Sequence, residues 1–264
     1  MKKSYAFISS AGIGSGILAL GLVLVVGPTS SKAATYSYGD FFGSSVIFQG
    51  VTESSITDVG PLFGAPILAG DTLDFNPQNF AAFSQGGGVD LTDGQLNFLI
   101  KATEGNSISQ LRFYEAGDFS LAGTGTGNTK VAVATSFFFD ILSVDGISIN
   151  PISLTASMVF APNANGQFDL ISNSGIGLFW SGGINFDINA ALDANSISYT
   201  SGATEVRVNL DNTLLAMSES GSVAYIAKKG FDGMGFTVSV PEPSSMTIAL
   251  LGMLALFGCG KRKA

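Results

Sequence analysis

The sequence predicts an all-β protein folded as a two-sheet, jelly-roll-like β-sandwich, and three observations support this. Apolar and polar residues alternate with a period of two along many short segments, as is typical of half-buried strands. Turn signals rich in Gly, Asn and Asp separate these segments. Between its two ends the chain shows no helical periodicity longer than two turns. About a dozen strands joined by short polar links favour a sandwich.

The alternation places the expected strands in order along the chain. In the segment 95–102, Leu96, Phe98 and Ile100 face one side, and in 204–210 Val206 and Val208 do the same. The segment 59–79 carries three prolines and is expected to be a long irregular excursion. The strands are expected at 45–51, 67–75, 95–102, 108–114, 130–142, 153–160, 177–180, 184–188, 196–200, 204–210, 222–228 and 235–240.

The composition excludes several kinds of chemistry. The 264 residues include no His, and the single Cys259 lies in the C-terminal apolar run. The region between the ends therefore offers no disulfide, no Cys-based metal site, no imidazole base and no Ser-His-Asp triad. Charged residues make up only 12% of the chain, so much of the surface is expected to be Ser, Thr, Asn and Gly.

The charge is distributed unevenly along the chain. Between residues 34 and 240 there are six basic and nineteen acidic residues, a net charge of −13, and the other six basic residues lie near the two ends. Because an acidic body repels phosphate backbones, we expect no nucleic-acid partner. The same excess of acidic groups suits a soluble exported protein and can attract divalent cations.

The N-terminal 33 residues have the order of a secretory signal peptide. Lys2 and Lys3 precede an apolar core, Pro28 ends it, and small residues follow before Ala33. We expect signal peptidase to cut after Ala33, with Ala34 as the near alternative. An uncleaved membrane anchor is the competing interpretation, because the apolar stretch is nearly long enough to span a bilayer.

The C-terminus combines a proline-rich motif, an apolar run and a basic tail. Pro241 and Pro243 cannot continue a strand or start a helix early. The apolar run 246–259 would form a helix of only about 21 Å, against a hydrocarbon core of ~30 Å, so it suits transient membrane insertion. The basic residues of the tail would stay in the cytoplasm by the positive-inside bias. The residues of this pattern are Val240, Pro241, Glu242, Pro243, Lys261, Arg262 and Lys263.

This C-terminal pattern resembles the PEP-CTERM sorting signal of Gram-negative bacteria, cyanobacteria among them. The resemblance covers about the last twenty-five residues and does not extend to the body of the protein. It implies recognition by an exosortase, which removes or exchanges the tail. It also implies export through the inner membrane to the cell surface or an extracellular biofilm matrix. We therefore divide the chain into a signal peptide (1–33), a β-sandwich domain (34–239) and a sorting signal (240–264). A plain membrane anchor with an incidental PEP tripeptide remains the alternative.

The body contains few candidate sites, and none of them points to a catalytic residue. The loop 163–169 and the group Asp187, Asn189, Asp193 and Asn195 offer oxygen ligands, so Ca²⁺ remains possible although no cofactor is expected. Ordinary turn residues are the alternative interpretation for the loop. Trp180, with Phe179 and Tyr199 near it in sequence, would suit a sugar-stacking platform or a place in the core.

Three functions fit these observations. The first is a non-enzymatic surface or matrix protein, processed by signal peptidase and an exosortase. The second is a lectin-like module that binds exopolysaccharide, with or without Ca²⁺. The third is a carboxylate-dependent glycan hydrolase, which is least favoured because no acidic pair stands out among the nineteen acidic residues of the body. The burial of Trp180 discriminates between the first two.

Overall fold

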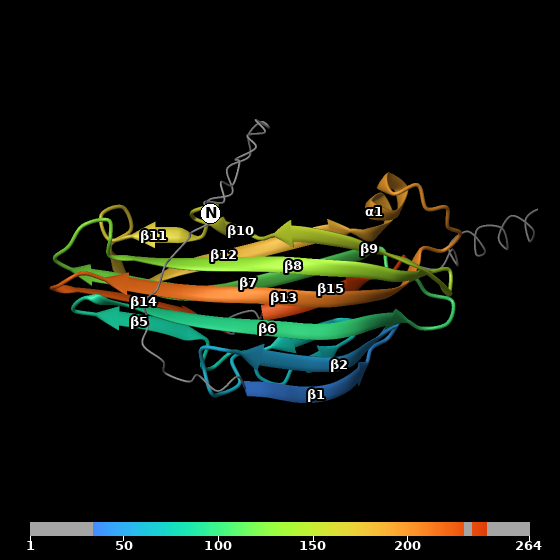
Figure 1. The fold of residues 1–264 in the computed structure, drawn as a ribbon, viewed down its shortest axis with the longest axis horizontal. Helices are drawn as coiled ribbons and strands as arrows, with labels where there is room; N and C mark the ends of the chain where they lie inside the picture. Colours follow the sequence, from blue (N-terminus) through green and yellow to red (C-terminus); the bar gives the residue numbers. More distant parts are fainter. Residues whose placement is uncertain (1–33, 230–233, 242–264) are drawn as a thin grey trace, which may run out of the picture. The chain divides into compact units, whose positions relative to one another are not determined.

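A computed structural model describes residues 34–229 and 234–241 of the chain. These residues form two antiparallel sheets and one short helix, which confirms the predicted all-β sandwich (Figure 1). Within the described residues, no helix is long and apolar enough to cross a membrane. The predicted signal peptide, and the C-terminal segment from Glu242 onward, lie outside the described residues.

Sheet A has seven strands, with β13 at its centre between β6 and β8 (Figure 1). The spatial order is β1, β2, β6, β13, β8 and β11, and β9 also pairs with β8. The strands are β1 (Ala34–Phe42), β2 (Val46–Ser55), β6 (Gly88–Ala102), β8 (Lys130–Val144), β9 (Ile147–Ser157), β11 (Gln167–Asp169) and β13 (Ala203–Ser218).

Sheet B has eight strands, and the long strand β7 is its centre. One edge of β7 pairs with β12, while the other pairs with β14 along one half and with β15 along the other half. Strands β4 and β3 continue beyond β15, β5 lies beyond β14, and β10 lies beyond β12. The strands are β3 (Ile67–Ala69), β4 (Thr72–Phe75), β5 (Ala81–Gln85), β7 (Gln110–Gly123), β10 (Val159–Ala161), β12 (Gly175–Asp187), β14 (Ser222–Lys228) and β15 (Met234–Ser239).

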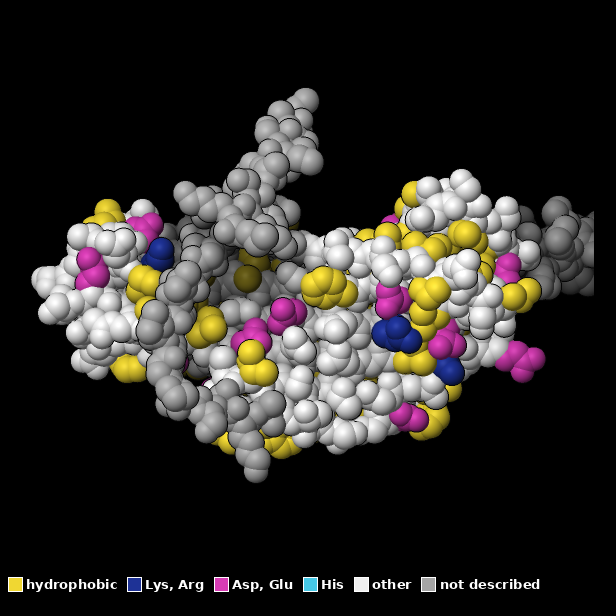
Figure 2. Space-filling view, viewed as in Figure 1, with side chains coloured by type: hydrophobic (Ala, Val, Ile, Leu, Met, Phe, Trp, Pro, Cys, Tyr) yellow, Lys and Arg dark blue, Asp and Glu magenta, His cyan; other side chains and the backbone are white. Residues whose placement is uncertain are grey.

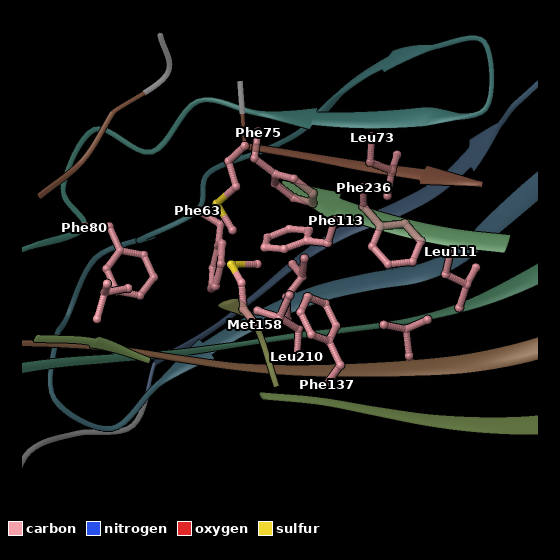
Figure 3. Packing of buried hydrophobic residues seen from close by; sticks show 14 of the residues in the cluster. Phe63, Leu73, Phe75, Phe80, Leu111, Phe113, Phe137, Met158, Leu210 and Phe236 are labelled. Carbon is pink, nitrogen blue, oxygen red and sulfur yellow. The ribbon is translucent and has the colours of Figure 1, made fainter. Parts of the chain in front are cut away.

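The core lies between the two sheets and is rich in phenylalanine. Phe137 of sheet A and Phe113 of sheet B meet edge to face with ring centroids 5.0 Å apart, and Phe98 meets Phe236 in the same way at 4.9 Å. Figure 3 shows Phe113, Phe137 and Phe236 packed together with Met158 and Leu210. Such edge-to-face pairs add about 0.5–1.5 kcal/mol each beyond the apolar area they bury.

The period-two alternation correctly predicted which side chains face the core. Leu96, Phe98 and Ile100 of β6 are buried, as are Val206 and Val208 of β13. The triple-phenylalanine run follows the same rule, because Phe137 and Phe139 are buried while Phe138 is 46% exposed on the outer face. The run therefore lies in a strand buried on one side, with one apolar residue exposed on the outer face.

Several predicted elements have different boundaries in the structure. The expected strand 67–75 is a hairpin of two short strands, and the strands 177–180 and 184–188 are one continuous strand, β12. The strand predicted at 196–200 is wrong, because that segment is a loop after the helix α1 (Ile188–Ala194). Asp187 caps this helix by accepting a hydrogen bond from the Ala190 amide at 2.9 Å, a local contact that competes with strand pairing.

Asp145 and Gly146 form one of the Gly- and Asp-rich turns that the sequence predicts between strands. Both residues have positive φ, 50° and 77°, as a two-residue hairpin between β8 and β9 requires. The Asp145 carboxylate also accepts hydrogen bonds from the amides of Thr200, Ser201 and Gly202 at 2.7–3.0 Å. These backbone donors lower the pKa of Asp145. These hydrogen bonds hold the loop that follows α1 against the turn between β8 and β9.

The surface matches the low charge of the sequence. Figure 2 shows scattered charged side chains on a face that is otherwise uncharged polar groups and backbone, with a few apolar side chains. Exposed apolar residues occur on both sheets, among them Phe138 and Phe179. Scattered apolar residues of this kind are normal for a folded surface.

Candidate functional site

Trp180 lies in the core and does not form a sugar-binding platform. Its side chain is 0% exposed and meets the Phe160 ring edge to face at 6.1 Å. The neighbouring Phe179 is 60% exposed, since successive residues of a strand face opposite sides of the sheet. The two side chains therefore cannot act together on one ligand. This excludes the platform interpretation, so Trp180 favours the first of the three functions and gives no support to sugar binding.

The predicted calcium loop is a backbone turn. It lines a hollow of about 630 Å³ together with Lys130. Two of its side-chain oxygens already accept hydrogen bonds: Asn165 Oδ1 accepts from the Gln167 amide at 3.1 Å, and Asp169 Oδ1 accepts from the Ile171 amide at 3.0 Å. These contacts favour the turn interpretation.

The second calcium candidate is divided between the two ends of the helix. Asp187 is the N-cap of α1, and Asn195 is the C-cap, where its amide donates to the Ala191 carbonyl at 2.9 Å. Asp187 and Asn195 therefore serve opposite ends of α1. Within residues 34–229 and 234–241, no three Asp, Glu, His or Cys side chains are grouped as a metal site requires.

Many acidic side chains of the body hold backbone amides in place. Glu53 is buried and accepts from the amides of Leu62, Phe63 and Gly64 at 2.6–3.1 Å. Glu219 accepts from the amides of Thr126 and Thr129, which lower its pKa. These carboxylates order loops, so much of the acidic excess has a structural explanation.

A shallow groove on the outer face of sheet B has a different character. It consists of two adjoining hollows of about 330 Å³ each, and both are lined by Arg112 and Tyr114 of β7. The strand register sets Tyr114 between Gly235 of β15 and Gly183 of β12. We call this surface the Tyr114 groove. Its polar side chains are Thr72, Asp74, Arg112, Tyr114, Asn185 and Thr237.

The two glycines beside Tyr114 are not required by the fold. Neither has a positive φ, and a Cβ at either position would meet no atom closer than 3.8 Å. Glycine inside a strand weakens the strand and often marks a site where a ligand approaches closely. With a glycine on each side, neither paired strand places a side chain beside the half-buried Tyr114.

The polar side chains of the groove are free to bind a ligand. Thr72 and Thr237 share a hydrogen bond of 3.0 Å between their hydroxyls. In contrast, Asp74, Arg112 and Asn185 make no side-chain hydrogen bond or ion pair with any other described residue. An amphipathic ring with a free cation, carboxylate and amide around it can contact both the apolar face and the hydroxyls of a sugar.

Sequence reasoning missed this groove. Its residues come from four strands, and residues 74, 114, 183 and 235 are neighbours only through the register of β4, β15, β7 and β12. The sole local signals are the glycines inside otherwise alternating segments, which indicate close backbone or ligand approach.

A second polar cluster is fully buried between the sheets. Lys228 of β14 forms an ion pair with Glu115 of β7, and both side chains are 0% exposed. From sheet A, the Thr135 hydroxyl donates to Glu115 Oε1 at 2.7 Å, and the Asn212 amide donates to Oε2 at 2.6 Å. Burial lowers the pKa of Lys228, against the opposing effect of Glu115. We call these four residues the Glu115 cluster.

Comparison with known proteins leaves the family open. No protein-family model matches the chain, and no curated protein matches it. Among solved structures, TmCBM61 in complex with beta-1,4-galactotriose is similar at 8% identity and a TM-score of 0.22, covering 80% of this chain and 89% of that one. The family 11 xylanase of Neocallimastix patriciarum is similar at 9% identity and a TM-score of 0.21, covering 79% and 100%.

A third solved structure is the enzymatically active domain of tailspike protein 4 of bacteriophage CBA120. It has 14% identity and a TM-score of 0.22, and the match covers 75% of this chain and 19% of that one. Likeness at these TM-scores carries no argument about function.

The structure describes only the first part of the predicted sorting motif. Strand β15 ends at Ser239, Val240 packs partly buried against the core, and Pro241 is exposed. Glu242, Pro243 and the basic residues 261–263 lie outside the described residues, as does Ala33. Ala34, the alternative cleavage position, is the first residue of β1.

Proposed function

We propose that this chain is an exported, non-enzymatic protein of the cell surface or extracellular matrix, with a jelly-roll-like domain that binds exopolysaccharide through the Tyr114 groove. The observation that carries the proposal is the tyrosine ring left open between two glycines that neither the backbone nor the packing requires. Asp74, Arg112 and Asn185 supply uncommitted polar groups within the same groove.

The number of carboxylates among the described residues of the groove favours binding over hydrolysis. Glycoside hydrolysis uses a pair of carboxyl groups about 5–10 Å apart on either side of the scissile bond. Among the described residues that line the two hollows, Asp74 is the one carboxylate. Cross-strand pairing forms a row of neighbouring residues that runs across sheet B through Tyr114, with Ile67 at one end and Val159 at the other. Both end residues are exposed, so the groove offers apolar contacts along a chain-like ligand.

Replacing Tyr114 by Ala should weaken binding to the recognised polysaccharide at least tenfold, or ~1.4 kcal/mol, because the groove loses its aromatic surface. A glycan array probed with the mature protein identifies the ligand, and affinity electrophoresis measures the change in binding strength. Tyr225→Ala is the matched control, since Tyr225 lies on the outer face of sheet B beside a different hollow. Equal binding by both variants would exclude the groove as the site.

Replacing Gly183 by Val should also weaken binding at least tenfold, since a branched side chain would cover one side of the Tyr114 ring. No atom lies within 3.8 Å of the new Cβ, and Val favours strands, so the melting temperature should stay the same or rise. Thermal melting and affinity electrophoresis are measured on the same sample. Unchanged binding would contradict the proposal even if the variant folds well.

We further propose that the C-terminal segment 240–264 is an exosortase sorting signal. The resemblance of this segment supports the proposal, and so does the position of Pro241, exposed directly after the last strand. In its native host the exported protein should lack residues 246–264, as intact-mass measurement would detect. Deleting the exosortase should leave the full tail in place and retain the protein in the membrane fraction. The same mass and location in both strains would contradict the proposal.

A further inference from the structure

The Glu115 cluster joins the two sheets and plays no part in the Tyr114 groove. Lys228 and Glu115 belong to sheet B, while Asn212 and Thr135 belong to sheet A. Lys228 Nζ and Asn212 Nδ2 both donate to the same oxygen, Glu115 Oε2. The cluster thus places an amine, a primary amide and a carboxyl group in one sealed site.

We propose that Lys228 and Asn212 become joined by an intramolecular amide bond, with Glu115 transferring the protons. The bond would connect β14 of sheet B to β13 of sheet A through side chains alone. It would be a covalent cross-link in a domain whose sequence offers no disulfide.

The geometry brings the reacting groups close together. Two nitrogens that share one acceptor oxygen lie no more than about 6 Å apart, twice a hydrogen-bond length. The Asn212 and Glu115 residues and the Lys228 side chain are 0% exposed, so the three groups are held with little freedom. Holding reactants in such a fixed arrangement removes much of the entropic barrier to a reaction.

The reaction balances without any added reagent. Proton transfer within the ion pair first gives a neutral Lys228 amine and a protonated Glu115. The amine then attacks Cγ of Asn212, while Glu115 donates its proton to the departing amide nitrogen and takes up the proton that the attacking amine loses. Ammonia leaves as the new C–N bond forms, so one amine and one primary amide become one secondary amide and one ammonia, and Glu115 stays protonated. This is general acid–base catalysis of a nucleophilic substitution.

The buried surroundings of Lys228 disfavour its charged form. Burial lowers the pKa of Lys228, so proton transfer to Glu115 yields the nucleophilic amine. The rings of Phe80 and Trp180 lie 5.1 and 5.3 Å from Nζ and exclude water. Asn212 Oδ1 is buried and accepts no hydrogen bond from a described residue. Protonated Glu115 can supply that missing donor as negative charge develops on the oxygen.

The product removes an unfavourable feature of the core. A buried ion pair costs desolvation energy that its attraction recovers only in part. Conversion to a neutral amide eliminates the buried ammonium and leaves Glu115 protonated. The cross-link encloses the turn between β13 and β14, so the sheets stay joined near this turn when the hydrogen bonds of the strands open.

Peptide mapping of the full-length protein tests the proposal. Trypsin should fail to cut after the acylated Lys228 and should release the peptide 208–229, about 17 Da lighter than its sequence because ammonia is lost. A glutamate-specific protease then cuts after Glu219, the single Glu of that peptide. The two halves should stay together as one species. Separate halves, or a tryptic peptide 208–228 of full sequence mass, would overturn the proposal.

Variants separate the roles of the three side chains. Glu115→Gln retains the shape of the carboxyl group and should abolish the mass loss, as should Lys228→Met. Lys229→Arg is the matched control, since this neighbouring lysine pairs with Asp118 and is 49% exposed. The variant removes the amine but keeps the tryptic site at position 229, and the mass loss should persist. A 17 Da loss that persists in Lys228→Met would indicate cyclisation of Asn212 alone and would refute the cross-link. The wild-type map decides the question even if a core variant does not fold.

Discussion

Replacing Trp180 by Ala should lower the free energy of unfolding by about 3–5 kcal/mol, the usual cost of removing a large aromatic side chain from a core. Trp180 is fully buried, packs against Phe160 and lies 5.3 Å from Lys228 Nζ. Its indole N–H has no hydrogen-bond partner among the described residues, so its removal also relieves an unsatisfied donor. That relief is about 1–3 kcal/mol at most and is smaller than the combined loss of transfer energy and packing.

Urea unfolding of the wild type and the variant gives this difference directly. Phe179→Ala is the matched control, because the adjacent Phe179 faces outward and is 60% exposed. Its substitution should change the free energy of unfolding by no more than about 0.5 kcal/mol. Similar losses in both variants would mean that β12 does not present its two faces as described.

The sequence alone was sufficient to predict the class of the fold, because the relevant signal is local. A half-buried strand must alternate, and Val206, Val208 and their counterparts in β6 do so regardless of which strands pair. The Asp145-Gly146 turn is local in the same sense, since both residues tolerate the positive φ that a tight hairpin needs. The short helix was missed because its stability comes from the Asp187 cap and from two buried side chains, Ile188 and Leu192.

The candidate sites could not be predicted in this way, because they depend on register between distant segments. Tyr114 is an ordinary outward residue of an alternating strand until β12 and β15 set a glycine on each side of it. Lys228 lies at the end of an alternating strand, where the sequence pattern predicts a surface residue. In the structure its side chain instead contacts Glu115, 113 positions earlier in the chain. The acidic excess suggested that the body attracts cations, but carboxylates such as Glu53 accept hydrogen bonds from backbone amides of other segments.

The sorting prediction has a different basis from the fold and the groove. It rests on a contiguous motif, and the structure describes only its first residues, Val240 and Pro241. Export and binding are therefore separable. A protein that binds polysaccharide but keeps its tail, or one that loses its tail but binds nothing, would each remove one half of the proposal and leave the other.

Replacing Gly117 by Ala should lower the free energy of unfolding by more than about 3 kcal/mol, at the upper end of the cost of overpacking a core. Gly117 lies on the inner face of β7, between Trp180 of β12 and Lys228 of β14. A Cβ there would overlap the Ala227 carbonyl oxygen and would meet two ring carbons of Trp180 at 2.8 Å. The carbonyl belongs to the backbone of a paired strand, so it cannot move without disturbing the β7–β14 hydrogen bonds.

The matched control is Gly183→Ala on the neighbouring strand β12. Its Cβ would meet nothing closer than 3.8 Å, and its φ is not positive, so the added methyl group should leave stability unchanged or raise it by up to about 1 kcal/mol. In thermal unfolding measured side by side, Gly117→Ala should therefore lower the melting temperature, and Gly183→Ala should leave it unchanged or raise it.

If Gly117→Ala has the melting temperature of the wild type, then β7 and β14 are not as closely apposed as described. The inner wall around the Glu115 cluster would then be open enough to admit water, and both the buried ion pair and the proposed amide bond would lose the dry environment that each requires.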